Sequence, residues 1–302
     1  MKPRDIALAV VIAAIWGFNF IAIKLGVTAV PPFFLTALRF MLAAFPALLF
    51  IARPKEGFGW VAGFGLVLGV GQFGFLFLAV RLGLPAGLTS LVMQAQAFWT
   101  MLFAWMMLRE VPTVQQVWGA IVGFLGIAII AYGRWSGSDL LPLLLCILAA
   151  AGWAAANIVS KMARPKDTLS FVIWSSLAVP LPMLVLSWIF EDHAQSLAAL
   201  TSPSWQVVGS LLYLAFLSTL FGYGAWNYLF NHYPASTVAP YSMLVPLFGI
   251  LGGALAFGER FDGYEIAGAV LIVAGLVTGN FGGRLAQALG IKKAEPAGSA
   301  NS

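Results

Sequence analysis

The most constraining feature of the chain is a succession of ten apolar runs, most of them roughly 20 residues long. A helix of about 20 residues crosses the hydrocarbon core of a bilayer, whereas a barrel strand needs about ten residues of alternating polarity. The composition agrees, with 61% hydrophobic and 9% charged residues and a mean hydropathy of +0.93. The sequence therefore predicts an all-α integral membrane protein with ten transmembrane helices, at residues 6–29, 33–52, 60–80, 86–108, 115–132, 140–160, 169–190, 206–230, 235–257 and 263–281.

An internal repeat divides these helices into two groups of five. Residues 85–110 recur in altered form as residues 234–259, at a constant offset of 149 residues. The matching positions include Pro85 and Pro234, Ala86 and Ala235, Glu110 and Glu259, Gly119 and Gly268, and Gly126 and Gly275. An offset of about half the chain indicates two copies of one unit. We predict a first repeat over residues 1–134, a second over 135–284 and a disordered cytoplasmic tail over 285–302.

The distribution of lysine and arginine predicts the orientation of the helices. With a cytoplasmic N-terminus, the cytoplasmic segments hold 11 of these residues and the outer segments hold 3, which favours both termini inside. Since five is an odd number, the second repeat is then inverted relative to the first. Inverted repeats can pack in two related ways that open to opposite sides, which is the geometry of alternating access. A duplicated helical scaffold without transport is the alternative.

The sequence argues against several other classes of function. All 11 acidic residues lie in predicted loops, tails or helix ends. This disfavours a carboxylate-based proton antiporter, a multidrug or quaternary-ammonium exporter and a membrane hydrolase. The single cysteine, Cys146, lies in an apolar run, and His193 and His232 are far apart in sequence. We therefore expect no enzyme activity, no cofactor and no metal site; the scattered basic residues also argue against a nucleic acid partner.

The candidate substrate-binding residues are polar and aromatic residues within the predicted helices. In chain order they are Trp16, Asn19, Lys24, Arg39, Gln72, Gln94, Gln96, Trp99, Trp153, Asn157, Tyr223, Trp226, Asn227 and Tyr241. Trp16 and Asn19 share one face of the first helix, and Tyr223, Trp226 and Asn227 share one face of the eighth. Aromatic residues that share a face with polar residues are informative because the others can simply face lipid.

Lys24 and Arg39 are the only charged residues well inside predicted helices. A rise of about 1.5 Å per residue places both in the outer half of the bilayer. Two interpretations are open for this pair. Either one of them attracts a substrate carboxylate, or Lys24 extends outward to the membrane surface and Arg39 bonds helix carbonyls.

Two glutamines interrupt the fourth apolar run. Gln94 and Gln96 are two residues apart and point about 200° away from each other on an α-helix, so that only one is expected to face a central pathway squarely. For both of them, and for Gln72, interhelical hydrogen bonding is the alternative role. In the second repeat Met243 and Val245 stand in place of the two amides, and Pro240 and Pro246 stand where the first repeat has Leu91 and Ala97. We therefore expect one repeat to supply amides and the other to supply bends.

Short motifs in both halves resemble the EamA family of the drug/metabolite transporter superfamily. They are WGFNF at 16–20, LRF at 38–40, PAGL at 85–88, LRE at 108–110, VAP at 238–240 and GER at 258–260. Within this family, exporters of cysteine and O-acetylserine, with exporters of aromatic amino acids as relatives, are similar at ARPK (52–55), QFGFLFLA (72–79), SLVMQAQAF (90–98), VIWS (172–175) and GYGAW (222–226). The resemblance covers roughly residues 5–282. It implies a bacterial inner-membrane exporter with a central cavity between the repeats.

Together these observations predict a secondary-type transporter that exports amino acids and related zwitterionic metabolites across the lipid bilayer. Amides would bind the charged groups of the substrate, and tryptophan and tyrosine rings would form the walls and contact the ammonium. Because no acidic side chain is expected in the cavity, we expect weak and broad binding. A monomer is the expected oligomeric state.

Overall fold

The computed structural model describes residues 1–135, 140–233 and 235–288, and its regular elements are helical. Within these ranges, nine helices are long and apolar enough to cross a membrane, and Pro32–Leu48 is a shorter apolar helix at the position of the predicted second span. The predicted ten-helix, all-α fold is therefore confirmed.

Each half of the chain supplies five spans. The first half consists of α1 (Pro3–Ala29), α2 (Pro32–Leu48), α3, η1 and α4 (Phe58–Leu66, Val67–Gly74 and Phe75–Arg81), α5, η2 and α6 (Ala86–Val92, Met93–Ala95 and Gln96–Leu108) and α7 (Val114–Arg134). The second half consists of α8 (Leu140–Ala163), α9, η3 and α10 (Thr168–Ser175, Ser176–Ala178 and Pro180–Phe190), α12, η4 and α13 (Trp205–Leu212, Tyr213–Phe221 and Gly222–His232), α14, η5 and α15 (Ala235–Val238, Ala239–Leu244 and Val245–Phe257) and α16 (Gly263–Ala288).

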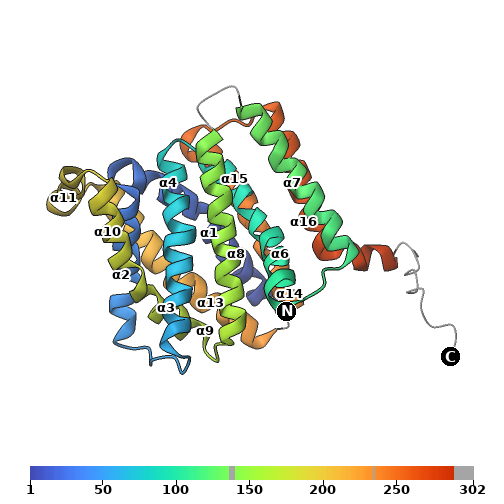
Figure 1. Ribbon diagram of the computed structural model, residues 1–302, viewed down its shortest axis with the longest axis horizontal. Helices are drawn as coiled ribbons and strands as arrows, with labels where there is room; N and C mark the ends of the chain where they lie inside the picture. Colours follow the sequence, from blue (N-terminus) through green and yellow to red (C-terminus); the bar gives the residue numbers. More distant parts are fainter. Residues whose placement is uncertain (136–139, 234, 289–302) are drawn as a thin grey trace.

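The spans run back and forth between two ends of the bundle. We call the end where α1 begins, at the bottom of Figure 1, the N-terminal face, and the opposite end the distal face. The short helix α11 (His193–Thr201) lies between α10 and α12 at the distal face. Asp192 caps it by accepting a 2.8 Å hydrogen bond from the Ala194 amide.

Helix α1 connects the two halves of the bundle. It packs against α4 and α5 from the first half and against α12 and α15 from the second. Gly17 makes one of these contacts possible, because a Cβ at this position would lie 2.7 Å from the carbonyl oxygen of Val245. Small residues at such crossings let membrane helices approach closely. Ile12 and Ile23 of the same helix are fully buried.

Five spans contain non-α segments where the sequence predicted continuous helices. The third and eighth spans contain π-helical η1 and η4, and the fourth and ninth contain 3₁₀ segments η2 and η5. These four interruptions recur at equivalent places in the two halves, whereas η3 in the seventh span has no counterpart in the continuous α2. π-Helical segments are frequent at functional sites. Pro240 explains η5, since proline has no amide to donate. Departures from α-helical geometry are not confined to the repeat that carries Pro240 and Pro246, because η2 interrupts the first repeat as well.

Helices α7 and α16 pack side by side at one edge of the bundle, shown in green and red in Figure 1. Their contact uses repeat-matched glycines. A Cβ at Gly126 would lie 2.6 Å from the Gly268 carbonyl oxygen, and a Cβ at Gly268 would lie 2.6 Å from that of Gly126. The glycines that mark the repeat in the sequence therefore bring two backbones into direct contact.

The end of α16 differs from the prediction. The helix continues to Ala288, so residues 285–288 are helical rather than part of a disordered tail. The rest of the predicted tail and Pro234, the repeat partner of Pro85, lie outside the described residues.

Candidate substrate cavity between the two halves

A cavity of about 330 Å³ lies between the two halves of the bundle. Ten of the predicted site residues line it: Trp16, Asn19, Arg39, Gln72, Gln94, Gln96, Trp153, Asn157, Tyr223 and Trp226. They come from α1, α2, η1, η2, α6, α8 and α13, so both halves contribute to one wall. The cavity thus collects polar and aromatic side chains that are far apart in the sequence.

A second chamber, of about 410 Å³, adjoins the first. The two share Trp153, Asn157, Tyr223 and Trp226 as lining residues. The second chamber is also lined by Ser160, near the end of α8, and Thr168, at the start of α9. Because both of these helix ends lie at the N-terminal face, the chamber extends the cavity toward that face. The predicted site residue Asn227 lines this second chamber.

Three aromatic rings form one wall of the central cavity. The ring centroid of Trp16 lies 5.6 Å from that of Tyr223 and 5.2 Å from that of Trp226. The Trp16 indole Nε1 donates a 3.1 Å hydrogen bond to the Ser218 carbonyl of η4, which fixes the ring. A Cβ at Gly222 would lie 2.6 Å from this nitrogen, so glycine is needed there. The wall offers ring faces that attract a cation.

Both glutamines of the fourth span line the cavity, contrary to the prediction that only one would face it. The reason is the 3₁₀ segment η2 (Met93–Ala95), which contains Gln94 and ends directly before Gln96. A 3₁₀ helix turns about 120° per residue, which brings two side chains two positions apart closer in direction than an α-helix does. Asn157 Nδ2 donates to Gln96 Oε1 at 3.2 Å and to Thr100 Oγ1 at 3.3 Å, so Gln96 also has the expected interhelical role.

Arg39 is the one charged side chain among the described residues lining the central cavity. It is 2% exposed, and its Nη2 donates a 3.3 Å hydrogen bond to Thr219 Oγ1 rather than to a helix carbonyl. Its Cζ lies 4.0 Å from the ring centroid of Phe73. Nε and Nη1 have no hydrogen-bond partner. The guanidinium is therefore held in place, but its donors are not all satisfied.

Three predicted site residues lie away from the cavity. Lys24 pairs with Glu259, which neither interpretation of the sequence anticipated. Trp99 packs against Phe124, with ring centroids 5.6 Å apart, on the side facing α7. Tyr241 packs against a small apolar cluster that includes Ile12. These three side chains face neighbouring helices in this conformation.

The cavity lining also contains seven residues that were not among the predicted site residues: Phe20, Phe73, Leu76, Met93, Ser218, Ser242 and Val245. Some carried a signal, since Phe20 follows Trp16 by four positions on the same helix face. Ser218 carried none, because its place depends on the π-helical geometry of η4. No group of three or more potential metal ligands occurs in the described part of the chain.

Two ion pairs lie at opposite ends of this pathway. Lys24 Nζ lies 2.7 Å from Glu259 Oε1 at the distal face, and Lys161 Nζ lies 2.6 Å from Glu110 Oε2 at the N-terminal face. Glu110 and Glu259 are repeat partners, and each follows a left-handed residue, Arg109 or Gly258, that ends its helix. The glutamates are therefore equivalent in the repeat, and each lysine comes from the first span of its half, α1 or α8.

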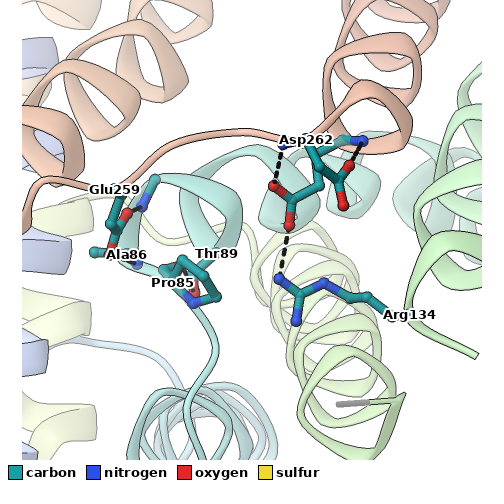
Figure 2. A network of polar contacts seen from close by, with 8 residues as sticks. Pro85, Ala86, Thr89, Arg134, Glu259 and Asp262 are labelled. Carbon is teal, nitrogen blue, oxygen red and sulfur yellow. Dashed lines mark hydrogen bonds and ion pairs between the residues drawn. The ribbon is translucent and has the colours of Figure 1, made fainter. Parts of the chain in front are cut away.

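The two ion pairs differ in their surroundings. Lys24 and Glu259 side chains are 28% and 9% exposed, whereas those of Lys161 and Glu110 are 54% and 50% exposed. Glu259 also accepts hydrogen bonds of 2.8 and 2.9 Å from the amides of Ala86 and Gly87, at the start of α5 (Figure 2). The Glu259 carboxylate is thus stabilised both by the Lys24 ammonium and by the N-terminus of α5. The distal end is closed more tightly than the N-terminal end.

A second contact fastens the distal face nearby. Arg134 Nη2 lies 2.7 Å from Glu265 Oε1, joining the end of α7 to the start of α16. Glu265 and Asp262 exchange hydrogen bonds with each other's amides, and Figure 2 shows Arg134 reaching this turn. This network holds the outer helix pair and lies apart from the cavity lining.

In the described part of the chain, nine membrane-length helices and one shorter apolar helix enclose a polar and aromatic cavity between two related halves, which defines a membrane transporter. The chain belongs to the EamA-like transporter family, whose model matches residues 4–132 and 140–280. The resemblance seen in the sequence is therefore confirmed.

Two relatives align with nearly the whole chain. A protein of Salmonella typhimurium (strain LT2) named probable amino-acid metabolite efflux pump is 40% identical over 292 residues, covering 94% of this chain and 97% of its own. A protein of Escherichia coli (strain K12) with the same name is 39% identical over 295 residues, covering 96% and 99%. A solved crystal structure that is 20% identical superposes with a TM-score of 0.59, covering 92% and 98%, and shares the fold.

Proposed function

We propose that this protein exports amino acids and related small metabolites from the cytoplasm by alternating access. The observation that carries the proposal is the cavity between the two halves, which combines an arginine, several amides and an aromatic wall. The names of the two efflux-pump relatives support the same substrate class. A multidrug or quaternary-ammonium exporter fits less well, because no aspartate or glutamate lines the cavity in the described part of the chain.

The proposed location is the bacterial inner membrane, with both termini in the cytoplasm. The excess of lysine and arginine in the connections at the N-terminal face supports this orientation. The second chamber then extends toward the cytoplasm, and the partly buried Lys24–Glu259 pair closes the periplasmic end. The conformation is accordingly inward-open, ready to receive a substrate.

Both ion pairs are formed in this conformation, and the difference in their exposure makes them a pair of contacts that strengthen alternately at the two ends. In the inward-open state, the Glu259 side chain is 9% exposed and accepts hydrogen bonds from the start of α5, while that of Glu110 is 50% exposed. In the outward-open state the roles exchange: the Lys161–Glu110 pair becomes enclosed and the Lys24–Glu259 pair opens. Inverted repeats produce such a pair of states because each half can adopt the arrangement of the other.

Counterflow in proteoliposomes tests the proposed function. Vesicles containing the purified protein are loaded with one unlabelled amino acid, and uptake of the same labelled amino acid is measured for a panel of amino acids and one quaternary ammonium compound. We expect transient accumulation of a subset of amino acids and no accumulation of the quaternary ammonium. Accumulation of the quaternary ammonium alone would assign the protein to the drug exporters, and no accumulation of any compound would favour a scaffold.

A further inference from the structure

Four buried polar atoms of the cavity-lining residues have no hydrogen-bond partner. Two are donors, Nε and Nη1 of Arg39, and two are acceptors, Oδ1 of Asn19 and Oε1 of Gln72. The side chains are 2%, 7% and 4% exposed, respectively. We propose that these residues form a zwitterion site, in which Arg39 binds the α-carboxylate and the amide oxygens of Asn19 and Gln72 receive the α-ammonium. This inference rests on the proposed function and assigns its recognition chemistry.

The first argument is the cost of leaving such atoms unpaired. A buried donor or acceptor without a partner forfeits its hydrogen bond to water, and most buried polar groups in native proteins are satisfied. A charged group inside the membrane region is costlier still and usually marks a substrate pathway. Thr219 and the Phe73 ring hold Arg39 in position, but neither carries the negative charge that would neutralise it.

The second argument is chemical complementarity. A guanidinium has donors and no acceptors, and its planar fork matches a carboxylate. An ammonium has donors only, and a carboxylate has acceptors only. The unpaired donors and acceptors of the cavity wall are therefore the complement of one α-amino acid. Trp16 and Trp226 add ring faces that attract the ammonium without neutralising it.

The third argument is that the site binds the carboxylate more strongly than the ammonium. The carboxylate meets a full charge, whereas the ammonium meets neutral amide oxygens and aromatic rings, since the described cavity lining holds no acidic side chain. A guanidinium–carboxylate contact is charged on both sides and can be bidentate, whereas an ammonium–amide contact is charged on one side only. The carboxylate is therefore the required group of the substrate, and the ammonium is the replaceable one.

Matched ligands test this assignment on the unmodified protein. The probes are the amino acid that the wild type moves fastest, its carboxamide, which lacks the carboxylate, and its 2-hydroxy acid, which lacks the ammonium. Each unlabelled analogue competes with labelled amino acid in proteoliposomes. We expect the 2-hydroxy acid to compete within about fivefold of the parent and the carboxamide to be at least about 30-fold weaker. A carboxamide as good as the parent would overturn the assignment.

Variants test the same roles from the protein side. Arg39→Gln should lower affinity for the parent and the 2-hydroxy acid about 10- to 100-fold and leave the weak carboxamide unchanged, and Arg39→Lys should restore part of the loss. Gln72→Leu should weaken the parent about fivefold and leave the 2-hydroxy acid unchanged. Arg53→Gln, at an exposed position outside this cavity, is the control for loss of one positive charge.

Three results distinguish the failures. Equal losses of affinity for all three ligands in Arg39→Gln, without rescue by Arg39→Lys, would mean that Arg39 supports the fold and does not bind the carboxylate. Unchanged affinity for the parent in Arg39→Gln would also overturn the assignment. Absence of flux for every amino acid in the wild type would instead overturn the proposed function itself.

Discussion

Lys24 Nζ lies 2.7 Å from Glu259 Oε1, and this contact ties α1 of the first half to the end of α15 of the second. The same carboxylate accepts hydrogen bonds from the first amides of α5. One glutamate therefore joins three helices at the distal face. Its repeat partner Glu110 pairs with Lys161 at the other end, so the two contacts can be compared directly by equivalent substitutions.

Glu259→Gln and Glu110→Gln should shift the protein in opposite directions. Loss of the Lys24–Glu259 pair favours the outward-open state. Loss of the Lys161–Glu110 pair favours the inward-open state. A membrane-impermeant thiol reagent, added outside intact cells, reports this through a cysteine introduced at Gln94, which lines the cavity. We expect faster labelling in Glu259→Gln by about tenfold, because a charged hydrogen-bonded contact is worth about 1.5–3 kcal/mol. Labelling should slow in Glu110→Gln.

Equal labelling of both variants would contradict reciprocal gates. The native Cys146 is fully buried, so it can be kept or replaced by alanine without adding a reactive site. The exposed ion pair gains less from its charges than the buried one, so the effect of Glu110→Gln should be the smaller.

Trp226→Ala and Gln94→Ala should lower amino-acid flux. Trp226 contributes a ring face to the cavity, and Gln94 contributes an amide. Losing either side chain removes a contact to the substrate and changes no charge in the cavity. We expect decreases of about three- to tenfold in proteoliposomes. Trp105→Ala is the matched control, because Trp105 is 53% exposed on the outside of the bundle. Wild-type flux in both cavity variants would remove these residues from the pathway.

The contact between α7 and α16 predicts a selective effect on stability. Gly126→Ala places a methyl group within 2.6 Å of the Gly268 carbonyl oxygen and should destabilise the fold by about 1–3 kcal/mol. Gly63→Ala is the control, since a Cβ there has no described neighbour within 4 Å. Thermal unfolding in detergent measures both. The same lowering of Tm in the two variants would show that the helix contact is not the cause.

Transport should depend little on pH near neutrality. The described residues that line the cavity include no aspartate, glutamate or histidine, the side chains that ordinarily titrate near or below neutral pH. We expect counterflow rates to agree within about twofold between pH 6 and pH 8. The measurement uses equal pH on both sides of the membrane. A steep change across this range would require a titrating group outside the described lining.

Much of this arrangement could be predicted from the sequence. Helix lengths follow from apolar runs, and the positions of Trp16 and Asn19 follow from α-helical spacing. The directions of Gln94 and Gln96 could not be predicted, because η2 changes the angle between them. The pairing of Lys24 with Glu259 was also missed, since the partners are 235 residues apart and meet only when the two halves pack.

The most direct test of the account is a reversible lock at the distal gate. Lys24→Cys and Glu259→Cys are combined in a protein with Cys146→Ala, and a short cleavable thiol crosslinker joins the two new cysteines. Counterflow of the preferred amino acid is measured before crosslinking, after it and after cleavage. Alternating access through the central cavity predicts that crosslinking stops flux and that cleavage restores it. Undiminished flux in fully crosslinked protein would contradict the account.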